Sequence, residues 1–292
     1  MARIALFCDG TWNSPTLKQP THVVRLFEKT RRSNAQHTHY FEGAGTGVNE
    51  AGLFGKALMK IGGGAFGWGL NGNIKQAYAA LCEQYEAGDE IFIFGFSRGA
   101  YTARSLAGMI CKCGIISDPT PKKIDEAFRL YRKPSVANHP DALHIMKKRR
   151  KLSPRFATSE NDINWRSVTP WANDPAQMHK IEIAYLGVRD TVGSLGIPAP
   201  LLGPVANIWN SRYRFHDTLL TSMVKAARHS VALDERRVFY RPALWDNLEA
   251  SRDDAGLNRG DRTEARPYHQ VWFTGNHAIV GGSAGRRKKR AR

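Results

Sequence analysis

The stretch that most constrains the fold is EIFIFGFSRGAYTARSLAGMI, residues 90–110. A dense apolar run of strand length passes directly into apolar residues at helical spacing, and the G-x-S-x-G pattern of Gly95, Ser97 and Gly99 lies at the junction. Because neither glycine carries a Cβ, a strand and a helix can approach each other closely at such a turn. In this context the pattern is typical of a nucleophile elbow, which holds a serine hydroxyl above the edge of a sheet.

The rest of the sequence alternates between patterns of strands and helices. This alternation predicts an α/β fold, with a mostly parallel central sheet and helices on both faces. The predicted strands are 4–8, 39–42, 91–96, 181–187, 238–240 and 271–274, and the predicted helices are 21–29, 74–86, 99–111 and 221–233.

The domain organisation follows from composition. We expect residues 1–283 to form a single domain, followed by a basic tail at 284–292. Within that domain, residues 118–171 are polar, basic and interrupted by prolines, so we expect an insertion that lies as a cap over the top of the core. The segment 43–72 is rich in glycine and predicts tightly packed loops.

A serine hydroxyl reacts as a nucleophile only when a histidine takes its proton and an acid orients that histidine. In α/β-hydrolases these residues follow in the order Ser, Asp or Glu, His. Asp190 follows the predicted strand 181–187 in a loop that contains glycine, and His277 follows the last predicted strand in GNHAIVGG. The predicted catalytic residues are therefore Ser97, Asp190 and His277.

Other histidines and acids fit these roles less well. His216 follows no strand, His229 falls in the predicted helix 221–233, and His269 falls in or before a strand, where we expect it to pack within the sheet. Asp217 and Asp234 lack a preceding buried strand.

The negative charge that develops on an ester oxygen needs N–H donors. The N–H of Arg98, at the start of the helix after the serine, is the first predicted donor, aided by the positive end of the helix dipole. A second donor is expected from the loop after the first strand, at Gly10 or Thr11. Asp9 could instead brace that loop through its side chain.

The sequence is strongly basic, with a net charge of +17 that is concentrated at 147–151 and in the final residues, 286–292. Such blocks attract phosphate-bearing partners such as an anionic membrane, and they are equally typical of a solvated insertion and a disordered tail. No zinc-finger or RNA-binding motif accompanies them, so nucleic-acid binding is not indicated as the main function. GAGTG lacks a following Walker lysine, and no metal-ligand spacing is present, so we expect a reaction without cofactor or metal.

Several long motifs together resemble the DUF2235 family. These motifs are FCDGTWN, GAGT, GDEIFIFGFSRGAYTARSLAGMI, YLGVRDTVGSLG, RHSVALDERRVFYRPALW and VWFTGNHAIVGG. The family includes the catalytic domain of type VI secretion phospholipase effectors of the Tle1 type. The resemblance implies an α/β-hydrolase fold, phospholipase A activity on bacterial membranes, and a secretion-system or immunity protein as partner. It also implies Ser97 as nucleophile, Asp190 as acid and His277 as base.

The histidine motif departs from the family pattern. The family usually carries an acidic residue two positions after the histidine, where this sequence has Ile279, and it continues into further helices beyond the motif. We therefore expect a less firmly held His277, and a loosely held base lowers the rate by orders of magnitude.

These observations lead to two main hypotheses. The first is a serine esterase or lipase that acts on phospholipid or another acyl ester, with a small-molecule esterase or thioesterase as a variant. The alternative is a catalytically impaired hydrolase fold that binds anionic lipid, nucleic acid or a protein through its basic patches. The apolar run at the N-terminus is too short for a signal peptide, so we expect cytoplasmic synthesis and, for an exported protein, a route without a cleaved signal.

Overall fold

The computed structural model describes residues 1–10, 13, 16, 19–43, 65–133, 138–168, 178–193, 219–249, 251 and 254–283. The predicted tail 284–292 and the rivals His216 and Asp217 lie outside this range.

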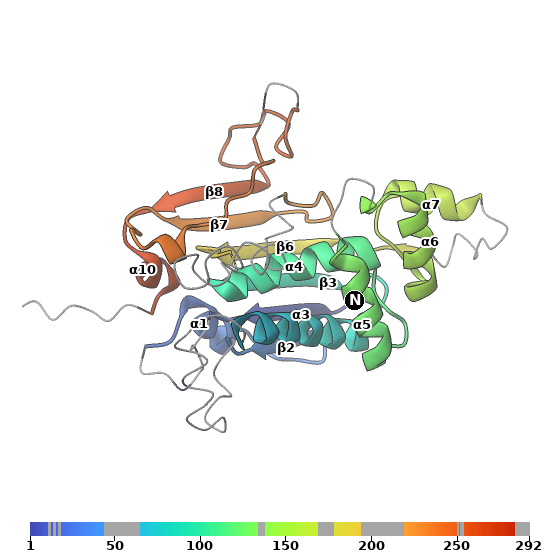
Figure 1. Cartoon of the computed structure of the whole chain (residues 1–292), viewed down its shortest axis with the longest axis horizontal. Coiled ribbons are helices and arrows are strands. Elements are labelled where there is room, and N and C mark those ends of the chain that lie inside the picture. Colours follow the sequence, from blue (N-terminus) through green and yellow to red (C-terminus); the bar gives the residue numbers. More distant parts are fainter. Residues whose placement is uncertain are drawn as a thin grey trace, which may run out of the picture.

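The core is a parallel six-stranded sheet in the order β2-β1-β3-β6-β7-β8. The strands are β1 (Arg3–Cys8), β2 (Gln36–Phe41), β3 (Glu90–Phe96), β6 (Ile183–Arg189), β7 (Ala227–Ala232) and β8 (Tyr268–Phe273). All the arrowheads in Figure 1 point to the same end of the molecule. The chain first adds β2 on one side of β1 and then adds every later strand on the other side, beginning with β3. The switch point of this topology lies between the carboxyl ends of β1 and β3, which is where open α/β sheets bind their ligands.

Helices cover both faces of the sheet. One face of the sheet packs against α3 (Ala65–Gln84), α4 (Arg98–Cys113) and α5 (Pro121–Tyr131) and forms the larger apolar core. Helix α1 (His22–Lys29) covers part of the other face, where the smaller apolar core lies. Successive residues of β1 serve the two faces in turn: Ile4 and Leu6 belong to the larger core, and Ala5 and Phe7 to the smaller one. A strand buried on both faces reads as a continuous apolar run, and this explains why the sequence predicts β1 and β3 so clearly.

The described residues of the polar segment predicted as a cap, 118–133 and 138–168, lie away from the carboxyl ends of the strands. It contains α5, α6 (Leu143–Leu152) and α7 (Glu160–Ser167), and β4 (Phe156–Ala157), which pairs with β5 (His179–Lys180). In Figure 1, α6 and α7 lie at the end of the sheet from which the strands start. The guanidinium of Arg149 donates to the carbonyls of Cys111 and Lys112, at the end of α4 opposite Ser97. The described residues of 118–171 thus pack at the end of α4 opposite Ser97, and their assignment as an insertion or cap within a single domain 1–283 stays a prediction.

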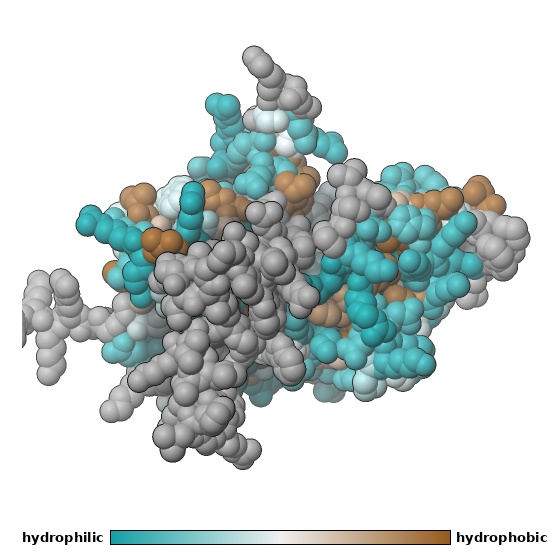
Figure 2. Space-filling view, in the orientation of Figure 1, coloured by the Kyte–Doolittle hydropathy of each residue, from teal (hydrophilic) through white to brown (hydrophobic). Residues whose placement is uncertain are grey.

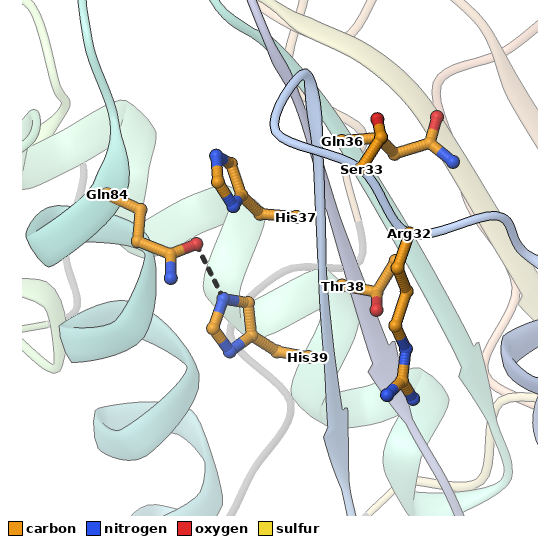
Figure 3. A pocket seen from close by; sticks show the side chains of 7 residues that line it. All are labelled: Arg32, Ser33, Gln36, His37, Thr38, His39 and Gln84. Atoms are coloured by element: carbon orange, nitrogen blue, oxygen red, sulfur yellow. Dashed lines mark hydrogen bonds between the residues drawn. The ribbon is translucent and has the colours of Figure 1, made fainter.

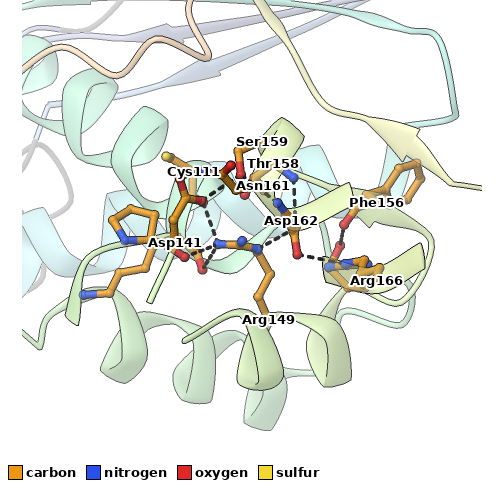
Figure 4. A network of polar contacts seen from close by, with 12 residues as sticks. Cys111, Asp141, Arg149, Phe156, Thr158, Ser159, Asn161, Asp162 and Arg166 are labelled. Atoms are coloured by element: carbon orange, nitrogen blue, oxygen red, sulfur yellow. Dashed lines mark hydrogen bonds and ion pairs between the residues drawn. The ribbon is translucent and has the colours of Figure 1, made fainter. Parts of the chain in front are cut away.

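A buried cluster of charge ties this segment together (Figure 4). Asp162 accepts hydrogen bonds from the Nε atoms of Arg149 and Arg166, each at 2.9 Å, and all three side chains are at most 1% exposed. Arg149 belongs to the basic block 147–151, for which the sequence left open a phosphate-bearing partner or a solvated surface. The positive charge of Arg149 is instead paired with Asp162 in the interior of the protein.

Three predictions of local structure need correction. The predicted helix 221–233 is not a helix, since its second half contains the strand β7, and the predicted strand 238–240 is a 3₁₀ helix, η4 (Val238–Tyr240). The end of the glycine-rich segment, from Ala65 to Gly72, forms the start of α3 rather than a loop. In β7 the buried residues alternate with partly exposed ones, but a histidine occupies one buried position, so the apolar alternation of a strand is hidden in the sequence.

Candidate active site

Ser97 lies at the sharp turn between β3 and α4, at the switch point of the sheet. Its backbone has φ 58° and ψ −123°, a strained conformation that is typical of functional turns. A Cβ on Gly95 would lie 2.6 Å from Cα of Ala100, and a Cβ on Gly99 would lie 2.1 Å from the carbonyl oxygen of Cys8. Only glycine fits at these two positions, since both contacts are with backbone atoms that cannot move aside.

Asp190 follows β6, the neighbour of β3 in the sheet. Its side chain is fully buried, and its backbone also has a positive φ, of 38°. The backbone N–H of Asp190 donates to the carbonyl of Ser230, and its Oδ1 accepts from the N–H of Ala232 at 2.8 Å. These bonds to β7 fix the carboxylate in one orientation and leave Oδ2 for a further partner.

His277 is the first residue of α10 (His277–Gly281), which follows β8. Its Nε2 lies 2.8 Å from Oγ of Ser97, and its Nδ1 lies 2.5 Å from Oδ2 of Asp190. Because an ionised carboxylate only accepts hydrogen bonds, we assign the proton of the neutral imidazole to Nδ1, which leaves Nε2 to accept from the serine hydroxyl. The three residues singled out in the sequence thus form one hydrogen-bonded chain. Groups in this order are those required to activate a serine by general-base catalysis.

The imidazole is held firmly by its surroundings. His277 is 5% exposed, and its ring centroid lies 4.7 Å from those of Phe96 and Tyr240. Its backbone N–H donates to Oε2 of Glu235, and bonds from Arg237 lower the pKa of Glu235 to about 2, so this acceptor stays ionised. The expectation of a loosely held histidine is therefore not supported by these contacts.

The loop after β1 approaches the serine closely. A Cβ on Gly10 would lie 3.1 Å from Cβ of Ser97. However, the N–H of Gly10 donates to Oδ1 of Asp9 at 2.7 Å, so this N–H is already engaged and its role as an oxyanion donor stays a prediction. Thr11 lies outside the described residues. Arg98 is the first residue of α4, directly after Ser97, and its role as a donor also stays a prediction.

Asp9 braces this loop, the role that the sequence suggested for its side chain. Its buried carboxylate accepts from the hydroxyls of Thr21 and Tyr40, both at 2.7 Å, as well as from the N–H of Gly10. Burial raises the pKa of Asp9, and the three hydrogen bonds oppose that effect. Thr21 also caps α1 by accepting from the N–H of Val24. The carboxylate therefore ties the loop after β1 to the start of α1 and to β2.

His229 is on a strand and not on a helix, and it supports the loop of Asp190. Its Nε2 accepts from the N–H of Thr191 at 3.2 Å, while its Nδ1 lies 2.9 Å from Oε1 of Gln270, the acceptor on β8. The residue next to the candidate acid is thus held by a neutral imidazole. The sequence could have indicated this supporting role through a histidine at a buried position of a strand. The incorrect assignment of a helix to 221–233 prevented that interpretation.

The remaining rivals lie elsewhere. His269 is buried within β8 and its Nε2 contacts the carbonyl of Arg266, in agreement with the predicted role in packing. Asp234 is exposed and accepts from the N–H of Gly275.

Acid should destabilise the protein through His229. Burial, followed by the charge of Arg104, lowers the pKa of His229 from 6.5 to about 3. Between these two values the unfolded chain binds a proton that the folded protein does not, so the free energy of unfolding falls as the pH falls. The loss is about 1.4 kcal/mol per pH unit below the unfolded pKa, or about 2 kcal/mol at pH 5.

Urea unfolding at pH 7 and pH 5 measures this loss. We expect wild type to lose about 2 kcal/mol more than His229→Gln on going to pH 5, because glutamine can accept from Thr191 without titrating. Equal losses in the two proteins would show that His229 takes up its proton in the folded state.

A separate pocket of about 210 Å³ lies beside the edge strand β2 (Figure 3). His37 and His39 point from β2 toward α3, where Oε1 of Gln84 lies 2.7 Å from Nε2 of His39. Since Gln36 pairs with Arg3 and Phe41 with Cys8, this pocket lies toward the start of the strands and away from Ser97. Across the part of the chain that the structure describes, no three His, Cys, Asp or Glu residues are grouped to hold a metal ion.

This chain is similar to several known proteins. The family described as "T6SS, Phospholipase effector Tle1-like, catalytic domain" matches residues 2–292. The uncharacterized protein YEL023C of Saccharomyces cerevisiae is 28% identical over 242 residues, which cover 80% of this chain and 31% of the yeast protein. Two solved structures are each 16% identical to this chain.

One of these structures is the Tle1 effector bound to the VgrG spike from the type 6 secretion system, with a TM-score of 0.41 and coverage of 98% of this chain and 51% of the effector. The other is an uncharacterized protein from Pseudomonas aeruginosa, with a TM-score of 0.46 and coverage of 97% and 42%. This chain thus spans about a third to a half of the length of these relatives. Because the family match extends over nearly the whole sequence, this chain belongs to the family of Tle1-like catalytic domains of type VI secretion phospholipase effectors.

Proposed function

We propose that this chain is a serine hydrolase that cleaves the carboxylic esters of phospholipids. The observation that carries the proposal is the hydrogen-bonded chain from Ser97 through His277 to Asp190, at the switch point of the sheet. Membership of a family named for phospholipase effectors supports phospholipid as the substrate class. The same family name leads us to propose a component of a type VI secretion system as a protein partner.

In the proposed acylation step, Nε2 of His277 takes the proton of Ser97 as Oγ attacks the ester carbonyl. Asp190 stabilises the resulting imidazolium through Nδ1 and keeps the ring in the required orientation. The tetrahedral intermediate collapses when the imidazolium gives its proton to the leaving alcohol. An acyl-enzyme and a free lysolipid result.

In the deacylation step, water attacks the acyl-enzyme while His277 acts again as general base. The carboxylic acid leaves and Ser97 regains its proton. In both steps the oxyanion is stabilised by the N–H of Arg98, at the N-terminus of the 16-residue helix α4. Gly10 becomes a second donor only if its N–H moves away from Asp9.

The burial of Arg149 weighs against the alternative of a binding protein that uses the block 147–151 as a single basic patch. The firm packing around His277 likewise favours an active site over an impaired one.

Labelling with a fluorophosphonate probe tests the proposal, because such probes react with activated serines. We expect the purified protein to be labelled at Ser97, with labelling lost in Ser97→Ala and strongly reduced in His277→Ala. Release of fatty acid from phosphatidylglycerol micelles then tests the substrate class. A folded protein that is not labelled at Ser97 would contradict the proposal.

A further inference from the structure

Exposed apolar side chains gather at the end of the molecule that carries the candidate active site. Five of these residues lie on or next to β7, η4, β8 and α10, and we call them the apolar rim. They are Leu233, Val238, Trp272, Phe273 and Ile279, with exposed fractions between 47% and 77%. Figure 1 shows that β7, β8 and α10 end or begin together, and Figure 2 shows hydrophobic side chains among hydrophilic ones in this region.

The rim residues lie close to His277 in the fold. The N–H of Leu233 donates to the carbonyl of Phe273 at 2.9 Å, so these two residues are neighbours across the ends of β7 and β8. Ile279 lies two residues after His277 on α10, and Val238 lies in η4 beside Tyr240, whose ring packs against His277. The apolar rim therefore borders the candidate site.

The charges beside the rim favour an anionic partner. Arg236 and Arg241 are exposed in the segment around η4, where the third arginine, Arg237, pairs with Glu235. The carboxylate of Glu235 is engaged with Arg237 and with the N–H of His277, and Asp234 holds the N–H of Gly275. The chain as a whole carries a net charge of +17, which draws it toward anionic lipid.

We infer that the apolar rim docks on the surface of an anionic phospholipid bilayer. This inference rests on the proposed function, the hydrolysis of phospholipids. Tryptophan and phenylalanine beside arginine are the side chains that settle at a membrane interface, where apolar rings enter the acyl boundary and cations face the head groups. Docking in this orientation brings the Ser97 end of the molecule to the lipid. The remaining exposed residues of the basic block, on α6, lie at the opposite end of the sheet and face away from that surface.

Co-sedimentation with vesicles of phosphatidylcholine and phosphatidylglycerol tests the docking. We expect the double variant Trp272→Ser, Phe273→Ser to bind at least about tenfold more weakly than wild type, because burial of one large apolar side chain is worth about 1.5–3 kcal/mol. Leu143 on α6 and Val168 after α7 are also apolar and are 50% and 81% exposed at the other end. The matched control Leu143→Ser, Val168→Ser should bind as wild type.

Fluorescence locates the contact directly. Brominated lipid should quench part of the tryptophan emission of the wild type, and this part should be absent in Trp272→Phe, which should still bind the vesicles. Binding that is equal in all variants, or quenching that is unchanged in Trp272→Phe, would overturn the proposal. So would a concentration-dependent dimer that is lost only in the rim variant, with no vesicle binding, because the rim would then contact a second copy of the chain.

Hydrolysis of a soluble ester, p-nitrophenyl butyrate, separates this inference from the proposed function. If the rim variant keeps soluble activity but loses vesicle binding, both proposals are supported. If no form hydrolyses any ester but the rim still directs vesicle binding, only the catalytic proposal fails.

Discussion

Replacing Ser97 by alanine should lower ester hydrolysis at least about 1,000-fold while leaving the protein folded, since loss of a serine nucleophile leaves only the weak catalysis of the remaining site. Among the described residues the side chain of Ser97 makes one hydrogen bond, to His277, and its positive φ strains alanine no more than serine. We therefore expect the free energy of unfolding to change by less than about 1 kcal/mol. Initial rates on p-nitrophenyl butyrate and urea unfolding measure the two quantities.

Two further variants distinguish a catalytic chain of residues from a generally damaged site. His277→Ala should lose about as much activity as Ser97→Ala, and the double variant should lose no more than either single one, because residues that act as a unit are not additive. Losses that multiply in the double variant, or a Ser97→Ala protein that retains near wild-type activity, would place the reaction elsewhere.

The residues of the candidate site could be found from the sequence because each follows a strand with a clear local signal. Ser97 stands between two glycines that the backbone contacts require, and β3 is apolar on both faces. Asp190 comes directly after β6 and His277 lies four residues after the end of β8, so the common direction of parallel strands brings them to one edge. Local pattern and topology agree at these positions.

The environment of the site could not be predicted in the same way, because it depends on pairings between distant segments. β7 forms between β6 and β8, and its buried His229 gains partners only from those neighbours. The engagement of the Gly10 N–H by Asp9 is likewise a property of the folded loop. Nothing in the pattern of residues 118–171 indicates which end of α4 they pack against.

The charge cluster in that segment was missed for a related reason. Asp162 and Arg166 are four residues apart on α7, a spacing that predicts an ion pair on a helix. Arg149, however, reaches Asp162 from α6, in a basic block that resembles a solvated face. A sequence pattern does not distinguish a buried arginine from its exposed neighbours until the helices are packed together.

Replacing Asp162 by alanine should destabilise the protein by about 3–5 kcal/mol, the usual effect of removing one partner from a buried ion pair. Burial already lowers the pKa of Arg166, and the charge of Asp162 opposes this shift. Without the carboxylate, two guanidinium groups that are at most 1% exposed would face each other in the interior without a counter-charge. Urea unfolding should show the loss as a lower midpoint with an unchanged slope.

Glu160→Ala is the matched control, because Glu160 lies on the same helix and pairs with Lys180 at 2.6 Å. Its side chain is 70% exposed, so the loss should be at most about 1 kcal/mol. If Asp162→Ala costs no more than Glu160→Ala, water must reach the guanidinium groups, and the segment 118–171 must be more loosely packed than these contacts require. Since the cluster lies at the end of α4 opposite Ser97, the rate of ester hydrolysis by the folded Asp162→Ala protein should stay near that of wild type.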